Sequence, residues 1–211
     1  MRYKYDIYNN LAEAFLNILF FPLKQIIPQP IINFIPLLLT NQEVRLRKVS
    51  NFIKGQLLDI GCGPNLLTKL YRTTGGKGVG VDVYPWAGVD QLVEDSSHLP
   101  YKDNSFDTIS FVACLNHIPS RTKTLKEANR LLRNDGIVII TNINPFLSLI
   151  WHKYAFWDRD YHERGLAEGE VYGFLEKELI AMLEEADFKL LHKEHYNWCT
   201  NKLYVFGKKR D

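Results

Sequence analysis

The sequence predicts an α/β fold, a doubly wound, seven-stranded and mostly parallel sheet with helices on both faces. Short apolar strand candidates alternate with helical segments from residue 56 to residue 186, which is typical of parallel strands joined by crossover helices. The first strand candidate ends in a glycine-rich turn that leads into a helix. The last two strand candidates lie close together in the sequence, so one of them is expected to run antiparallel.

The chain has 211 residues, of which 46% are hydrophobic, enough to bury the core of one domain. We expect a helical appendage or lid over residues 1–40 and the main α/β domain over residues 41–211. A helix is expected over residues 8–21, capped by Asn9 or Asn10, and prolines then break the segment through residue 36.

Residues 11–39 are strongly apolar but too often interrupted by proline to span a bilayer, and no signal-peptide cleavage site follows them. Two roles stay open for this segment. It covers the site or packs on the core, or it makes a peripheral membrane contact that collects a lipophilic ligand.

The main domain is expected to begin with a capping box at Thr40 and Glu43, which starts a helix running to about Phe52. The pattern then predicts a turn at 134–136 and further helices at 66–73, 121–132, 147–156 and 176–186. It predicts strands at 56–60, 78–83, 91–94, 108–113, 137–141, 189–196 and 202–207.

Charge and cysteine content exclude several classes of protein. The formal net charge of +2 is too balanced for a dedicated nucleic-acid-binding protein, so no nucleic-acid partner is expected. Cys62, Cys114 and Cys199 are far apart and have no metal-ligand spacing, so we expect neither a disulfide framework nor a metal site. This cysteine usage fits a reducing cytoplasm.

The strongest chemical signal is residues 57–65, LLDIGCGPN, where the first strand meets a helix. Ligands of open α/β sheets bind outside the carboxyl ends of the strands. A dinucleotide turn would need a small residue where Leu66 stands, and Asp59 would repel a pyrophosphate. The acidic residue instead suits a ligand that carries an ammonium group and a sulfonium.

This segment resembles the first motif, D/E-x-G-x-G-x-G, of class I S-adenosylmethionine-dependent methyltransferases, and the resemblance implies their Rossmann-like fold. Asn65 replaces the third glycine; asparagine tolerates a left-handed backbone and also caps helices. The resemblance makes S-adenosyl-L-methionine the expected cofactor. Its expected ligands in this motif are Asp59, Gly61, Cys62, Gly63 and Asn65.

Two later segments extend the resemblance. Asp82 ends the second strand candidate, so the resemblance implies that Asp82, with Val83 beside it, binds the ribose. Residues 93–107, VEDSSHLPYKDNSFD, resemble the family stretch D-x-x-x-L-P-F-x-D-x-S-F-D and imply that Asp95 and Ser96 face the adenine. The short interval between Asp82 and Asp95 predicts a loop, in which Tyr84 or Trp86 lies against the adenine or packs elsewhere.

The resemblance places Ala113 and His117, just beyond the fourth strand candidate, at the methionine end of the cofactor. His117 is the candidate general base; a histidine that packs at the start of a helix is the alternative. Methyl transfer depends chiefly on alignment, so the sequence need not contain a fixed catalytic residue.

We therefore expect a methyltransferase that acts on a small-molecule or lipid-like acceptor. Acceptor contacts are expected in the aromatic, charged stretch after the fifth strand candidate, at Tyr154, Trp157, Tyr161 and His162. The alternative is a catalytically inactive cofactor-binding scaffold or regulatory subunit with the same fold.

Overall fold

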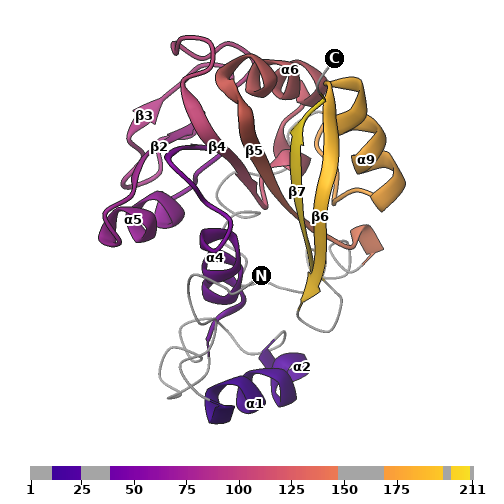
Figure 1. The fold of residues 1–211 in the computed structure, drawn as a ribbon. Helices are drawn as coiled ribbons and strands as arrows, with labels where there is room; N and C mark the ends of the chain where they lie inside the picture. The colour runs from indigo at the N-terminus through magenta and orange to yellow at the C-terminus, as the bar shows by residue number, and fades with distance from the viewer. Residues whose placement is uncertain (1–10, 25–38, 147–168, 197–200, 210–211) are drawn as a thin grey trace.

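The computed structural model describes residues 11–24, 39–146, 169–196 and 201–209. A seven-stranded sheet has the order β3-β2-β1-β4-β5-β7-β6 (Figure 1). Strand β7 pairs antiparallel with both β5 and β6, and the other neighbouring pairs are parallel. The strands are β1 (Gln56–Ile60), β2 (Lys77–Asp82), β3 (Gln91–Leu92), β4 (Phe106–Val112), β5 (Leu132–Ile143), β6 (Phe188–Tyr196) and β7 (Asn201–Lys208).

Helices cover both faces of the sheet, as a doubly wound fold requires. Alternate residues of β1 point to opposite faces, so Leu57 belongs to one apolar core and Leu58 to the other. On the Leu57 face lie α4 (Asn41–Ser50) and α5 (Leu66–Thr73). On the Leu58 face lie α6 (Arg121–Leu131) and α9 (Glu176–Glu185).

Most expected elements are confirmed to within a few residues. The capping box at Thr40 is present: its Oγ1 accepts a hydrogen bond from the amide of Glu43, whose carboxylate accepts one from the amide of Thr40. The turn expected at residues 134–136 is wrong. Strand β5 continues through these residues, and the register against β4 shifts between Phe106 and Thr108, so a bulge absorbs the extra residues.

The N-terminal segment differs from the single helix expected over residues 8–21. It forms α1 (Leu11–Leu19) and α2 (Phe21–Lys24). Helical backbone therefore passes Pro22, because proline is tolerated in the first turn of a helix, where its missing amide costs no hydrogen bond. The caps expected at Asn9 or Asn10 and the helix expected at 147–156 lie outside the described residues.

Polar groups link α1 to α4 and to the residues just before it. The Asn17 side chain, 2% exposed, accepts a 2.8 Å hydrogen bond from the amide of Leu39, and Glu13, also 2% exposed, lies 3.8 Å from Arg47 of α4. Figure 1 shows α1 and α2 beyond α4, on the side toward which the β6 arrow points. Strand β5 runs parallel to β6, since both are antiparallel to β7. Helices α1 and α2 thus lie on the side of the carboxyl strand ends.

Candidate functional site

The strand order reverses between β1 and β4, and this switch point is where ligands of doubly wound sheets bind. The tips of the two strands contact each other there. The Cys114 thiol donates a 2.9 Å hydrogen bond to the carbonyl of Ile60, and the Ser110 hydroxyl donates one of 2.6 Å to the Asp59 carboxylate. The first-strand motif and the residues after the fourth strand are therefore brought together.

The loop after β1 is held in a left-handed conformation at Gly61 (φ 68°), Gly63 (φ 53°) and Asn65 (φ 59°). A β-carbon on Gly61 would lie 2.7 Å from the β-carbon of Cys114, so only glycine fits between the two strand tips. Among the described residues, nothing lies within 4 Å of the place a β-carbon on Gly63 would take. The loop is thus closed on its Gly61 side and open at Gly63.

Asn65 takes the left-handed backbone expected of it, but its expected capping role is wrong. Its side chain makes no capping hydrogen bond to α5 and instead donates a 3.0 Å hydrogen bond to the carbonyl of Gly88. A capping residue typically has an extended backbone, whereas that of Asn65 is left-handed. The residue therefore ties the first-motif loop to the loop after β2, and it is fully buried there.

Asp59 lies beneath this loop with 2% of its surface exposed. Burial raises the pKa of its carboxyl group to about 7, because the charged form loses hydration. The hydrogen bond from Ser110 opposes this rise, and the nearby charge of Asp82 adds to it. Asp59 is a carboxyl group whose charge a cation could stabilise.

Asp82, at the tip of β2, has one carboxylate oxygen 2.8 Å from the amide nitrogen of Gly63 and the other 2.9 Å from that of Tyr84. It therefore links the first-motif loop to the loop that follows β2. Val83 beside it is 54% exposed. Residues 83–90 form the expected loop, in which the rings of Tyr84 and Trp86 lie 4.6 Å apart.

Negative charge gathers around the first-motif loop. Burial raises the pKa of the Cys62 thiol, and the charges of Asp59, Asp82 and Asp90 raise it further. Asp90, which the sequence analysis did not single out, accepts a 2.8 Å hydrogen bond from the amide of Gly80 and pairs with Arg72. This field suits a cationic ligand and opposes a pyrophosphate, so the donor set and the opening at Gly63 fit S-adenosylmethionine.

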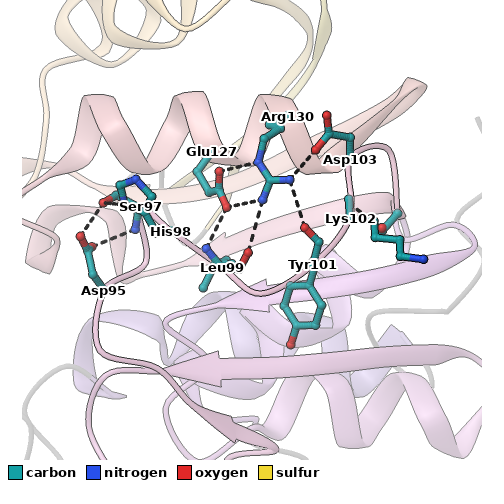
Figure 2. Close-up of polar contacts among 10 residues, drawn as sticks. Asp95, Ser97, His98, Leu99, Tyr101, Lys102, Asp103, Glu127 and Arg130 are labelled. Atoms are coloured by element: carbon teal, nitrogen blue, oxygen red, sulfur yellow. Dashed lines mark hydrogen bonds and ion pairs between the residues drawn. The ribbon is translucent and has the colours of Figure 1, made fainter.

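Side chains of α6 hold the segment that follows β3, residues 95–103, in place (Figure 2). Arg130 donates to the carbonyls of Leu99 and Tyr101 and to the carboxylates of Asp103 and Glu127, and Glu127 accepts from the amide of Leu99. Figure 2 shows the Arg130 guanidinium at the centre of this network. The side chains of α6 thus set the path of the loop over residues 95–103.

Asp95 and Ser96 occupy the start of that loop in different ways. The Asp95 carboxylate accepts two hydrogen bonds from Ser97, one of 2.8 Å from the Ser97 amide and one of 2.5 Å from the Ser97 hydroxyl. Ser96 is 7% exposed, and its hydroxyl lies 3.0 Å from that of Thr124. Asp95 is itself exposed, and both residues stay predicted adenine contacts.

Ala113, after β4, has a left-handed backbone (φ 54°), and its amide donates a 2.9 Å hydrogen bond to the Thr141 hydroxyl of β5. This turn directs the chain into the short helix η1 (Leu115–His117). The Nδ1 atom of His117 lies 3.0 Å from a carboxylate oxygen of Glu170, a residue that the sequence analysis missed. No local motif marks Glu170, because 53 residues separate it from its partner.

The acceptor contacts expected at Tyr154, Trp157, Tyr161 and His162 lie outside the described residues. Cys199 lies outside them as well. Among the described residues, neither Cys62 nor Cys114 forms a disulfide bond.

This chain is similar to known proteins in structure and in sequence. Its structure matches that of an S-adenosylmethionine-dependent methyltransferase from Methanosarcina mazei with a TM-score of 0.59 and 19% identity, covering 78% of this chain and 98% of that one. It also matches a 1,6-didemethyltoxoflavin-N1-methyltransferase from Burkholderia thailandensis with a TM-score of 0.59 and 17% identity, covering 79% of each chain. The fold is thus that of the S-adenosylmethionine-dependent methyltransferases.

Residues 31–193 match the methyltransferase domain family, and the chain belongs to that family. A demethylmenaquinone methyltransferase from Staphylococcus aureus is 31% identical over 131 residues, which is 56% of this chain and 54% of that protein. The matches span only 26% to 54% of the lengths of the first three curated relatives.

Proposed function

We propose that this chain binds S-adenosylmethionine at the β1–β4 switch point and transfers its methyl group to a small-molecule acceptor. The observation that carries the proposal is the hydrogen bond between the Asp82 carboxylate and the amide of Gly63. It lies beside the open space at Gly63, and the acidic residues around it make the local electrostatic potential negative. A carboxylate has about four acceptor sites, so two amide contacts leave Asp82 able to accept from ribose hydroxyls.

We assign the remaining cofactor contacts by position. Asp59, Gly61, Cys62, Gly63 and Asn65 form the part of the site for the amino-acid end, and Asp82 with Val83 forms the ribose part. Asp95 and Ser96 form the adenine part, and Ala113 and His117 border the reacting methyl group. The cofactor supplies a methyl carbon made electrophilic by the sulfonium; the residues orient it and exclude water.

Thermal unfolding of the full chain tests the cofactor assignment. S-adenosylmethionine and S-adenosylhomocysteine are expected to raise the melting temperature and NAD is not, since a ligand at a hundred times its Kd adds about 2.7 kcal/mol. Asp82→Asn should lose most of the shift. Asp135→Asn, an exposed carboxylate on β5, is the matched control and should keep it. Stabilisation by NAD alone would refute the proposal.

We further propose that the acceptor is lipid-like and that α1 and α2 contact a membrane surface. Among the side chains of α1 and α2 that the structure describes, the exposed ones are apolar and recur at helical spacing, whereas the polar Glu13 and Asn17 are buried. The exposed fractions are 89% for Leu11, 65% for Phe15, 56% for Ile18, 53% for Leu19 and 46% for Leu23. Among the described residues no helix has the length and apolar character needed to cross a bilayer.

Co-sedimentation with phosphatidylcholine vesicles tests the membrane contact. The intact chain is expected to pellet with vesicles, and the double variant Phe15→Glu, Leu19→Glu is expected to stay in the supernatant. Leu191→Glu replaces an equally exposed leucine on β6, 54% against 53% for Leu19, and should still pellet. An intact chain that does not pellet would rule out this contact.

Turnover separates an enzyme from an inactive scaffold with the same fold. Release of S-adenosylhomocysteine should be measured with a panel of phenols and isoprenoid hydroquinones, which includes the acceptor class named for the relative from Staphylococcus aureus. An enzyme turns over with at least one acceptor. Cofactor binding without turnover across the panel would favour the scaffold.

A further inference from the structure

A histidine and a buried carboxylate form a pair at the acceptor side of the proposed site. The Nδ1 atom of His117 and the Oε2 atom of Glu170 are 3.0 Å apart, and their side chains are 15% and 2% exposed. His117 lies directly after β4, where the methyl-bearing end of the cofactor is proposed to bind. The pair therefore stands where a proton would have to be removed from an acceptor.

Independent contacts fix the backbone around Glu170. Asn116 and Val171 exchange two hydrogen bonds, of 3.1 Å from the Asn116 side chain and 3.0 Å from the Val171 amide. Arg121 donates to the carbonyl of Gly169. The Asn142 side chain makes two hydrogen bonds with the backbone of Phe174, of 2.9 Å and 3.2 Å. The segment over residues 169–174 is thus fastened to the tips of β4 and β5 by several contacts that do not involve the Glu170 carboxylate.

Burying a carboxylate costs free energy of folding unless the charge is paired. If residue 170 served only to fasten this segment, it would not need to be acidic. The Glu170 carboxylate lies against His117, and its charge also acts on the guanidinium of Arg121. A carboxylate on Nδ1 sets which ring nitrogen carries the proton. The geometry is that of a base with a partner that orients it.

Building on the proposed function, we infer that Glu170 is a positioning residue that keeps the proton of neutral His117 on Nδ1 and leaves the lone pair on Nε2. His117 then accepts a proton from the acceptor's hydroxyl group at Nε2. The O–H bond breaks, its electron pair stays on the oxygen, and the imidazolium is held against the Glu170 carboxylate. Such a base suits an acceptor such as a phenol or enol, whose nucleophile must lose a proton.

The tautomer of His117 can be measured without knowing the acceptor. Long-range ¹H–¹⁵N correlation spectra of the labelled full chain at about pH 8.5, above the ordinary titration range of histidine, distinguish the two tautomers. The signals of His117 are assigned by their loss in His117→Gln. We expect the Nδ1–H tautomer in the parent protein and a shift toward Nε2–H in Glu170→Ala.

Asn142→Ala is the matched control, because it removes two bonds of the same segment and leaves the His117–Glu170 pair in place. It should keep the Nδ1–H tautomer. An Nε2–H tautomer in the parent protein, an unchanged tautomer in Glu170→Ala, or an equal change in Asn142→Ala would overturn the inference. If Glu170→Ala does not fold, the inference is tested by the spectra of the parent protein and of Glu170→Asp. Both are expected to show the Nδ1–H tautomer.

Kinetics with an acceptor from the turnover panel give a second readout. Glu170→Gln should lower kcat by about 10- to 100-fold, as is typical when the partner of a functional histidine is lost, and should leave KM for the cofactor within about 2-fold. Glu170→Asp should restore part of the rate. A rise in KM with unchanged kcat would contradict positioning. If the Nδ1–H tautomer is found but S-adenosylmethionine does not bind, the proposed function is refuted. The inference that Glu170 orients His117 would still hold.

Discussion

At the scale of single residues, Asp59 links stability to ligand binding. Its carboxyl group has a raised pKa of about 7 because burial removes water from its charged form. The folded protein therefore holds this proton up to about pH 7, whereas the unfolded chain releases it near the ordinary value of 3.8. Between these pH values the folded state binds more protons, so its free energy of unfolding falls as pH rises.

Asp59→Asn should remove that dependence. Between about pH 5 and pH 8 the parent protein should lose about 3 kcal/mol more unfolding free energy than the variant, since the linkage acts over about two pH units and each is worth about 1.4 kcal/mol. Urea unfolding at both pH values measures the difference. The amide can still accept the hydrogen bond from Ser110, so the comparison isolates the charge. Parallel changes in both proteins would contradict the raised pKa.

The two glycines of the first-motif loop should respond differently to the same change. Both have a positive φ, so alanine costs backbone strain of about 1 kcal/mol at either position. Gly61→Ala also forces a β-carbon against Cys114 and should destabilise the fold by about 2 kcal/mol more. Gly63→Ala enters open space, so it should keep most of the stability and weaken S-adenosylmethionine binding. Chemical unfolding and thermal shifts separate the two effects.

At the scale of elements, α6 determines the shape of a loop that it does not contain. Arg130 makes hydrogen bonds to two carbonyls and two carboxylates, and this set matches the planar fork of donors in a guanidinium (Figure 2). An ammonium group cannot reach all four partners. The loop over residues 95–103, which carries the predicted adenine contacts, therefore depends on one side chain of a neighbouring helix.

Arg130→Lys should keep the charge but lose most of this network. We expect about 1–2 kcal/mol of lost unfolding free energy and a weaker affinity for S-adenosylhomocysteine, measured by unfolding and by calorimetry. Arg133→Lys is the matched control. The Arg133 side chain contacts Asp107 and the carbonyl of Asn104, outside this loop. The variant should therefore leave the affinity for S-adenosylhomocysteine unchanged. Equal losses of affinity in both variants would show that the network is not specific to the loop.

At the scale of the whole molecule, the apolar pattern predicted the sheet because its central strands, β1 and β4, bury both of their faces. Strand β1 and helix α5 begin and end where the sequence placed them, since an apolar run bounded by Gly61 and a helix-starting turn leaves little choice. The bulge in β5 was missed because residues 133–136 look like a turn locally. Pairing of Leu132 and Ile137 with β4, on either side of these residues, keeps the strand continuous. The domain division at residue 40 stays a prediction.

The sequence by itself determined the order of elements along the chain, the glycine turn after the first strand and the acidic residues at the strand tips, because these follow from local patterns. The tertiary structure decided the order of the strands in the sheet and the point at which it reverses. Only the tertiary structure decided what each charged group touches: the depth at which Asp59 is buried, the binding of residues 95–103 by Arg130, and the meeting of His117 with Glu170. Such contacts join residues tens of positions apart. Their energies depend on the distance between the groups and on how deeply each is buried, and neither quantity can be read from positions in the sequence.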